Sequence, residues 1–540
     1  MRPTRVSPVT LAEAVHALPP GLPGPGPAPG TPADAWQVAV TGLSISSADV
    51  VPGDLYLGLP GARHHGARFA ADAVAAEAAA VLTDEAGLEH VRGLDVPVFT
   101  APELRRLVGP LSAVIFASRP DDGSAPVLLG VTGTNGKTTT TYFINSLLGA
   151  LGRTTGLIGT IEIKAGDEPI PSTLTTPESP QVHGLLGLMR EKGLDAAAME
   201  VSSHAISYRR VDGVRYDVAG FTNLTQDHLD LHGSMEEYFQ AKAALFTPER
   251  ARRAVVTVDD EWGARLAGQA RIPVLSLDTS AASGGTPFRS ESGAPADWTV
   301  RALTRRGLGH AFELHGPDGA VLRAATGLPG TFNVSNAALA AVMVLASGVP
   351  AARLQEALDR DPFTVEVPGR MQLISEQPAA IVDFAHNPDA LSRTLESVRR
   401  PGTGSRVIAV FGATGQRDET KRPLMGAVAA RLADVVIVTD DDPHDEDEAR
   451  IRAGVLAGAR EAQRAESLPC EILEVAPRAA AIERAVQLAK PADTIVVAGR
   501  GHEVWQEVKG VNLALDDRVE LRQALTKHGF SGLSPERVES

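Results

Sequence analysis

Cysteine is almost absent from this sequence, because Cys470 is the only one among 540 residues. A single cysteine cannot form a disulfide within the chain and cannot build a thiolate metal site, so any metal would need oxygen or imidazole ligands. Disulfide-stabilised and thiolate-zinc proteins are thereby excluded. The composition is typical of a reducing compartment, and we expect a cytoplasmic protein.

Positive charge is also scarce, since 51 lysines and arginines stand against 66 aspartates and glutamates, a formal net charge of −15. Such a chain is a poor candidate for wrapping a nucleic-acid backbone, so we expect no nucleic-acid partner, although a local pocket for a small phosphate ligand stays open. The longest apolar run, residues 337–346, has about half the length that spans a bilayer. It predicts a buried helix, and no membrane insertion is expected.

The length and the rhythm of apolar segments predict three α/β domains. Domains commonly span about 100–200 residues, and strand-like runs that alternate with helical stretches favour parallel sheets covered by helices. We place a small α/β domain at 1–122, a central parallel-sheet domain at 123–365 and a third, Rossmann-like α/β domain at 366–540. Residues 19–32, rich in proline and glycine, are predicted to be a flexible insertion, and 298–327 to hold a hairpin.

The strongest local signal is a glycine-rich turn directly after the strand-like residues 126–131. Backbone N–H groups of such a turn cradle phosphate oxygens, Lys137 reaches the β- and γ-phosphates, and the Thr138 hydroxyl reaches Mg²⁺. A strict motif would have glycine at Val131, so a chance turn is the alternative, but the strand before and the helix after favour a phosphate loop. The predicted loop residues are Gly133, Thr134, Asn135, Gly136, Lys137, Thr138 and Thr139.

Further polar residues follow two neighbouring strand-like segments. Glu200 ends the first segment and could hold Mg²⁺, although a carboxylate there is often solvated or caps a helix. Two aspartates and two histidines follow the second segment within six residues and suit a metal or proton-transfer cluster, with a polar helix cap as the alternative; they are Asp227, His228, Asp230 and His232. Lys242 lies in an otherwise apolar helical stretch, where a lysine usually extends to solvent.

The third domain carries an acidic run at residues 440–448. Carboxylates in a first helical turn cap free N–H groups and suit the helix dipole, and Pro443 is at home near a helix start. Seven acids in nine residues exceed what capping requires. A pocket for a cationic ligand is therefore the second interpretation.

In this order, the motifs resemble those of the Mur ligases of peptidoglycan precursor synthesis, and specifically the MurE type, which adds the third amino acid of the peptide. The resemblance runs over nearly the whole chain. It rests on the phosphate loop and on the segments 199–204, 223–232, 330–337, 368–371, 383–389, 417–425, 441–444 and 499–503.

The resemblance implies an ATP- and Mg²⁺-dependent ligase that joins a diamino acid to the D-glutamyl carboxylate of UDP-N-acetylmuramoyl-L-alanyl-D-glutamate through an acyl phosphate. It implies a UDP-substrate-binding first domain, an ATP-binding second and an amino-acid-binding third; we further expect a monomer. The catalytic positions implied are Lys137, Glu200, His228 and Lys242, the last as a carbamate. The metal positions are Thr138, Glu200, His228 and carbamylated Lys242.

Ligand-binding positions follow from the same resemblance. The additional ATP positions are Asn333, Asn336, Arg370, Asp383 and His386. The UDP-dipeptide positions are Ser47, Thr175, Thr176, Ser202, Tyr208 and Arg210, although the family usually has Asp-Ser-Arg where this chain has Ser-Ser-Ala around Ser47, and often glutamine in place of Tyr208. The amino-acid positions are Arg417, Asp441, Asp442, Pro443, His444, Gly499 and Glu503.

The amino acid that is added follows from one loop. Relatives that add diaminopimelate typically carry Asp-Asn-Pro-Arg, whose arginine forks onto the second carboxylate of the diacid. This chain has Asp441-Asp442-Pro443-His444, in which a second acid replaces the amide and a histidine replaces the arginine. The exchange predicts L-lysine, with L-ornithine possible since one methylene shifts binding by only ~1–3 kcal/mol, and meso-diaminopimelate as the alternative.

Two other functions stay open. A folylpolyglutamate synthase would share the reaction type, but such a chain would begin near the phosphate loop, whereas some 120 residues precede it here. A non-catalytic binding partner on the Mur fold is the alternative from a different class. The intact Lys137, Thr138, Glu200, His228 and Lys242 argue against loss of catalysis.

Overall fold

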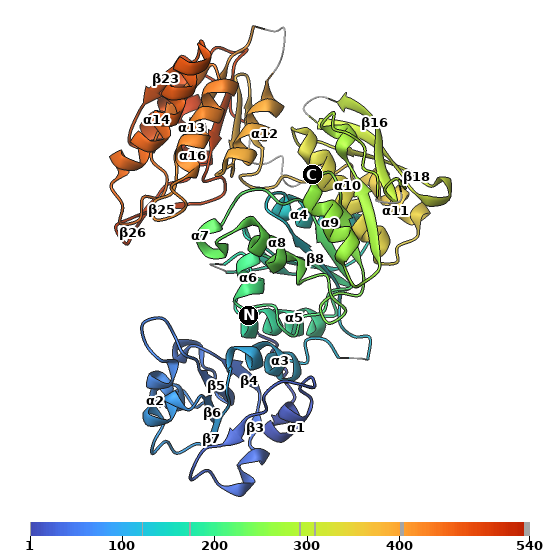
Figure 1. Cartoon of the computed structure of the whole chain (residues 1–540), viewed down its shortest axis with the longest axis vertical. Helices are drawn as coiled ribbons and strands as arrows, with labels where there is room; N and C mark the ends of the chain where they lie inside the picture. The colour runs from blue at the N-terminus through green and yellow to red at the C-terminus, as the bar shows by residue number, and fades with distance from the viewer. Residues whose placement is uncertain are drawn as a thin grey trace.

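A computed structural model describes residues 2–120, 122–171, 174–290, 293–306, 309–399 and 404–533. Three lobes follow one another along the chain, and each is built around a sheet of its own (Figure 1). The first lobe lies at one end, the central lobe in the middle, and the third lobe beside the central one at the other end. This arrangement confirms the three-domain α/β fold class. The boundaries at 122/123 and 365/366 stay predictions.

The first lobe has a five-stranded sheet in the order β2-β7-β6-β5-β4. Four strands are parallel, and β2 pairs antiparallel at the edge. The prediction of a flexible insertion at 19–32 was wrong, because β2 lies in it; an edge strand tolerates glycine and proline, since only one of its sides must form hydrogen bonds. The elements are β1 (Val9–Thr10), α1 (Leu11–His16), β2 (Gly26–Pro27), β3 (Ala39–Val40), β4 (Gly42–Ser44), β5 (Asp54–Gly58), α2 (Ala70–Ala75), β6 (Ala80–Thr83), β7 (Val98–Thr100) and α3 (Arg105–Ile115).

The central lobe holds an eleven-stranded sheet in the order β11-β10-β9-β12-β8-β13-β14-β15-β16-β17-β18. Its middle is parallel, and antiparallel strands flank it on both sides. The predicted hairpin is confirmed as β17 and β18. The strands are β8 (Val127–Thr132), β9 (Thr155–Ile158), β10 (Ile163–Ala165), β11 (Glu168–Ile170), β12 (Ala196–Glu200), β13 (Val218–Phe221), β14 (Ala254–Thr257), β15 (Val274–Asp278), β16 (Trp298–Arg306), β17 (Gly309–His315) and β18 (Val321–Thr326).

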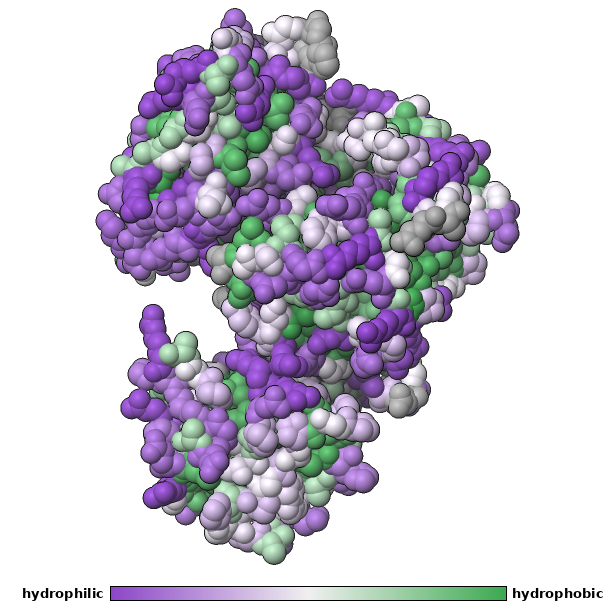
Figure 2. Space-filling view, viewed as in Figure 1, coloured by the Kyte–Doolittle hydropathy of each residue, from purple (hydrophilic) through white to green (hydrophobic). Residues whose placement is uncertain are grey.

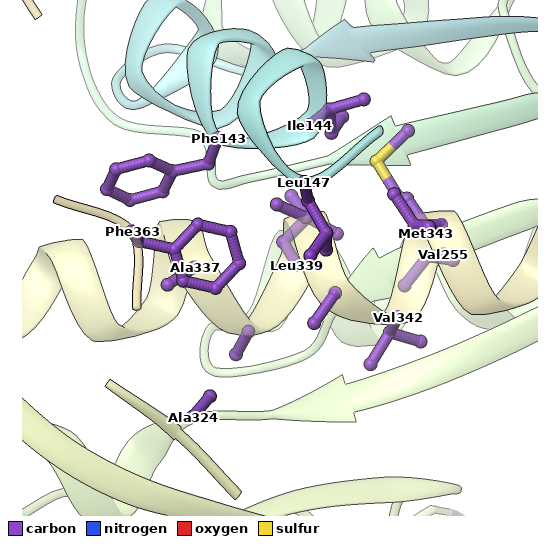
Figure 3. Close-up of a cluster of buried hydrophobic side chains, with 14 of the residues drawn as sticks. Phe143, Ile144, Leu147, Val255, Ala324, Ala337, Leu339, Val342, Met343 and Phe363 are labelled. Carbon is purple, nitrogen blue, oxygen red and sulfur yellow. The ribbon is translucent and has the colours of Figure 1, made fainter. Parts of the chain in front are cut away.

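The core of the central lobe surrounds α10 (Thr331–Ala346), which confirms the predicted buried helix at 337–346. Leu339, Val342 and Met343 of this helix pack between α4 (Lys137–Ala150) and the sheet (Figure 3). Phe143 of α4 meets Phe363, with ring centroids 4.8 Å apart. The other helices are α5 (Ser179–Glu191), α6 (Ser203–Ser207), α7 (Leu229–His232), α8 (Met235–Ala243), α9 (Glu261–Gln269) and α11 (Ala351–Arg360).

The third lobe has a six-stranded sheet in the order β19-β20-β24-β21-β22-β23, parallel except for β19 at one edge. A small hairpin, β25 and β26, projects from it towards the first lobe (Figure 1). The elements are β19 (Gln372–Glu376), β20 (Ala379–Asp383), α12 (Pro388–Val398), β21 (Val407–Phe411), α13 (Lys421–Leu432), β22 (Val435–Val438), α14 (Glu448–Glu466), β23 (Glu471–Glu474), α15 (Arg478–Leu488), β24 (Thr494–Ala498), β25 (Trp505–Val508), β26 (Val511–Ala514) and α16 (Asp517–Lys527).

No helix in the part of the chain that the structure describes combines the length and the apolar character needed to cross a membrane.

Candidate active site

Three parallel strands of the central sheet end side by side at the phosphate loop. Val131 of β8 pairs with Glu200 of β12 and with Gly220 of β13, so the residues after these strands meet at one edge of the sheet. Gly133 and Gly136 have positive φ values of 146° and 90°, and a Cβ at Gly136 would lie 2.3 Å from the side-chain oxygen of Asn336. Only glycine permits this loop geometry.

Lys137 opens α4 and folds back over the loop. Its Nζ donates to the carbonyl oxygens of Gly133 at 3.0 Å and Thr134 at 2.8 Å. Burial lowers its pKa from the ordinary value. The ammonium therefore lies at the helix N-terminus, where phosphate oxygens would gather.

The Glu200 carboxylate and the Thr138 hydroxyl, both predicted to hold Mg²⁺, lie in direct contact. It is fully buried and accepts hydrogen bonds from the Thr138 hydroxyl at 2.9 Å and from the backbone N–H and hydroxyl of Thr160 at 2.7 and 3.0 Å. Hard oxygen donors of this kind fit Mg²⁺, which commonly binds few protein ligands together with phosphates and water. Within the described ranges, no three His, Cys, Asp or Glu residues gather as a preformed metal site.

The Asp227–His228 segment links the central lobe to the third. His228 has a positive φ of 53° and its ring lies 4.7 Å from that of His204. Asp227 lies 3.8 Å from His228 Nδ1 and 3.6 Å from Nε2 of His386 in the third lobe. The predicted polar cluster therefore spans two lobes.

Lys242 lies behind the phosphate loop and does not reach solvent. It is 1% exposed, its Nζ donates to the Gly133 carbonyl at 2.8 Å, and the amine lies 4.5 Å from the centre of the Tyr238 ring. Burial, together with the nearby Lys137 charge, holds its pKa well below the usual range. The alternative that Lys242 extends to solvent was therefore wrong. Lys242 is a buried amine, and its lowered pKa favours the neutral form.

Two further segments bring predicted ATP positions to the loop. Asn336 donates to the Asn333 side chain at 3.0 Å at the start of α10, and Arg370 donates to the Thr138 hydroxyl at 3.3 Å while its guanidinium lies 4.1 Å from the Phe384 ring centre. Asp383 accepts from the backbone N–H of Met371 and the hydroxyl of Thr394, both at 2.8 Å, so it holds the loop that carries Arg370. His386 bonds to the Phe384 carbonyl at 2.8 Å.

The predicted dipeptide positions lie in two places. Thr176 donates to the Glu200 carbonyl at 2.9 Å, Thr175 accepts from Thr160 at 3.1 Å, and Arg210 donates to Glu178 at 2.8 Å. Ser202 caps α6, and Tyr208 is 45% exposed near Arg210. Ser47 lies in the first lobe, away from these residues, in the short 3-10 turn Ser47–Asp49.

The acidic run of the third lobe is largely paired with arginines. Asp440 bonds to Arg452, Asp442 to Arg500, and Glu446 to Arg422 by two hydrogen bonds of 2.7 Å. Asp447 caps α14. These four of the seven acids therefore have an arginine or helix-cap partner, and the pocket for a cationic ligand stays a prediction.

Three of the predicted amino-acid positions, Asp441, Pro443 and Gly499, pack beneath the surface next to the acidic run, whereas Glu503 lines the cleft. Asp441 is buried and accepts from the Asp442 N–H at 2.8 Å. A Cβ at Gly499 would lie 2.6 Å from an Asp441 oxygen, and Pro443 is buried beside Gly415. Burial and the Asp441 charge raise the pKa of Glu503 to about 8.

One cleft of about 1850 Å³ between the central and third lobes brings most of these residues together. Hydrophilic residues cover most of the third lobe on the face shown, with smaller apolar areas among them (Figure 2). Its lining includes Thr134, Asn135, Gly136, Lys137, Thr138, Thr139, Thr175, Thr176, Glu200, Ser202, Arg210, His228, Asn333, Asn336, Arg370, Asp383, His386, Arg417, Asp442 and Glu503. Its lining does not include Ser47, Gly133, Tyr208, Lys242, Asp441, Pro443, His444 and Gly499.

Several cleft residues were missed by the sequence analysis. Thr160, Asp259, Trp505, Glu507 and Asn512 line the same space. Isolated polar residues outside a motif carry no local signal. Trp505, Glu507 and Asn512 belong to the β25–β26 hairpin, which follows the last motif of the sequence and has no motif of its own.

Family models and relatives match nearly the whole chain. The Mur ligase middle domain matches residues 131–344, the Mur ligase glutamate ligase domain 369–501, and the Mur ligase family catalytic domain 39–110. A UDP-N-acetylmuramyl-tripeptide synthetase of Leifsonia xyli is 45% identical, over 92% of this chain and 94% of its own length.

Two diaminopimelate-adding ligases are also similar. The UDP-N-acetylmuramoyl-L-alanyl-D-glutamate–2,6-diaminopimelate ligase of Streptomyces coelicolor is 42% identical, over 97% of this chain and 98% of its own. A solved structure of a ligase with the same name is 28% identical with a TM-score of 0.63, covering 97% of this chain and all of that one. On these matches, the chain belongs to the Mur ligase family, and within it to the MurE type of ATP-dependent tripeptide synthetases.

Proposed function

We propose that the chain joins a diamino acid to the D-glutamyl carboxylate of UDP-N-acetylmuramoyl-L-alanyl-D-glutamate at the expense of ATP. The observation that carries this proposal is that one cleft between two lobes brings most of the predicted residues together. The phosphate loop and the Thr138–Glu200 oxygens lie on its central side, beside Thr176 and Arg210, and Glu503 lies on the third-lobe side. The first lobe supplies the uridine-binding region, with Ser47 within it.

The chemistry requires activation because a carboxylate is a poor electrophile. A carboxylate oxygen attacks the γ-phosphorus of ATP and ADP leaves; the amine then attacks the acyl carbon, phosphate leaves, and the amine proton passes to solvent. Lys137 and the loop N–H groups gather the charge that develops on the phosphoryl oxygens. Mg²⁺, held by Thr138 and Glu200 with His228 nearby, would supply further charge neutralisation.

Lys242 is proposed to carry a carbamate. Carbamate formation requires the neutral amine, which attacks CO₂ to give an N-carboxylate and releases a proton. The buried position and the depressed pKa of Lys242 favour that neutral amine. Lys242→Arg keeps a cation but cannot form a carbamate, and it should lose most activity. Full activity in this variant, or no added mass of CO₂ on the native protein, would contradict the assignment.

The identity of the amino acid is the finer part of the proposal. The relatives named above favour meso-diaminopimelate, and the prediction of L-lysine has no support from them. The Asp442–Arg500 pair also weakens the argument for lysine, because Asp442 is not a free charge that repels a second carboxylate. We therefore propose meso-diaminopimelate, with L-lysine as the second candidate because His444 replaces the arginine fork.

The deciding assay uses purified protein, ATP, the UDP-dipeptide and a panel of meso-diaminopimelate, L-lysine and L-ornithine. Formation of ADP, phosphate and a UDP-tripeptide of the correct mass supports the ligase. Binding of nucleotide and UDP-dipeptide without an amide product from any amino acid would favour the non-catalytic alternative. A higher kcat/KM for L-lysine would restore the second candidate, and His444→Arg should then move the preference towards the diacid.

A further inference from the structure

The β25–β26 hairpin places an additional carboxylate, Glu507, in the cleft. Its backbone N–H donates to Asp442 Oδ1 at 3.2 Å, and its carbonyl accepts from the His444 N–H at 3.3 Å. Its side-chain Oε2 lies 2.8 Å from Nδ1 of His444. The backbone N–H of Lys509, in the turn of the hairpin, donates to the His444 carbonyl at 2.8 Å. The hairpin therefore holds Glu507 firmly against the loop that sets the amino acid.

A chain of contacts links Glu503 to Glu507 through Arg500 and Asp442. The guanidinium of Arg500, which is fully buried, lies 3.8 Å from Glu503 and bonds to Asp442, and Asp442 accepts from the backbone of Glu507. Glu503 therefore adjoins the Arg500–Asp442 pair through the guanidinium and Glu507 adjoins it through its backbone N–H, and both residues line the cleft. Two acidic side chains therefore line this part of the cleft, which suits a ligand that carries two amines.

Glu507 retains a free acceptor. Its side chain is 40% exposed, and Oε1 accepts no hydrogen bond from any residue in the described ranges. The contact between Oε2 and His444 limits the rotation of the carboxylate. An oriented, partly desolvated carboxylate oxygen is a suitable acceptor for an ammonium group.

We propose that Glu507 binds the distal ammonium of the incoming diamino acid and thereby selects diamino acids over monoamino acids, with His444 as its positioning residue. This inference rests on the proposed function. Meso-diaminopimelate, lysine and ornithine all carry a distal ammonium, so it holds whichever of them is added.

The test separates the effect of the Glu507 charge from the effect of the side chain's size. Glu507→Gln keeps the size and loses the charge, whereas Glu507→Asp keeps the charge on a shorter side chain. Glu507→Gln should raise the KM for the diamino acid ~10-fold or more, with kcat and the KM values for ATP and UDP-dipeptide within about 3-fold. Glu507→Asp should retain a lower KM than Glu507→Gln. Glu471→Gln, on the exposed strand β23 of the same lobe, is the matched control.

Three outcomes separate the inference from its alternatives. An unchanged KM in Glu507→Gln would overturn it. The inference would also be overturned if Glu507→Gln left the KM for the diamino acid unchanged while Glu507→Asp raised it. It would likewise be overturned if Glu507→Gln raised the KM values for the diamino acid, ATP and the UDP-dipeptide equally, because Glu507 would then only support His444. Absence of product in the native protein would instead contradict the proposed function.

Discussion

The two boundaries of the central lobe are built differently. At the first boundary, α3 packs directly on α5, and the backbones approach so closely that a Cβ at Gly109 would lie 2.0 Å from the Asp212 carbonyl oxygen. His183 is fully buried there between the Ser118 hydroxyl at 2.8 Å and the Asp212 carbonyl at 2.9 Å. This contact is closely packed.

The second boundary is an open polar cleft with a few direct hydrogen bonds. Asn135 of the phosphate loop donates to Asp389 at 3.0 Å, and Asn387 donates to Asp227 at 3.4 Å. Close packing resists relative motion, whereas isolated polar contacts can be broken and remade. On this comparison, the first and central lobes form one closely packed unit, and we expect the third lobe to be the one that moves during turnover.

The largest effect is expected at the cleft. Lys137→Ala should lower turnover ~10²–10³-fold, since it removes a charge that meets the developing phosphoryl charge. The melting temperature should hardly change, because Lys137 donates only to two loop carbonyls. Initial rates and thermal melts measure both. Lys192→Ala, which breaks a surface pair with Glu168, is the control. Near-normal turnover in Lys137→Ala would contradict the assignment of the phosphate loop to the active site.

At the first boundary, the largest expected effect is a loss of stability at low pH that arises from His183. Burial lowers the pKa of His183 from 6.5 to about 4. Between these values the unfolded chain binds a proton that the folded chain does not, so the free energy of unfolding falls as the pH drops from 6.5 towards 4. The loss should reach roughly 3 kcal/mol. Urea unfolding at pH 7 and 4.5 tests this, and His183→Gln, which cannot titrate, should show a smaller pH dependence. An identical pH dependence in the variant would argue against a buried neutral imidazole.

A smaller effect is expected from crowding the same boundary. Gly109→Ala should destabilise by ~1–3 kcal/mol, because the new methyl meets a backbone carbonyl that cannot move away easily. Gly149→Ala is the matched control, since Gly149 is also helical but nothing lies within 4 Å of its Cβ position. That change should be neutral or stabilise by up to ~1 kcal/mol. Equal behaviour of the two variants in denaturant unfolding would show that the first boundary is loosely packed.

The same contrast explains what the sequence could predict. The phosphate loop, Glu200 at the end of β12 and the buried helix α10 were predicted, because a glycine turn, a strand end and an apolar run are local patterns. The pairing of Asp442 with Arg500 was not, because it joins residues 58 positions apart through tertiary packing. For the same reason, residues 19–32 were predicted to be a flexible insertion, since β2 depends on the edge of β7.

The smallest effect should come from one of the polar contacts across the cleft. Asp389→Ala removes the acceptor of Asn135 and should lower kcat/KM for ATP by ~2–10-fold, the usual contribution of one hydrogen bond. Stability should stay close to that of the native chain, because Asp389 is on the cleft surface. Asp389→Asn keeps an oxygen that can accept the same hydrogen bond and should recover most of the loss. If Asp389→Ala had native kcat/KM but melted several degrees lower, the second boundary would be a packed contact like the first, and the contrast between a fixed platform and a moving lobe would fail.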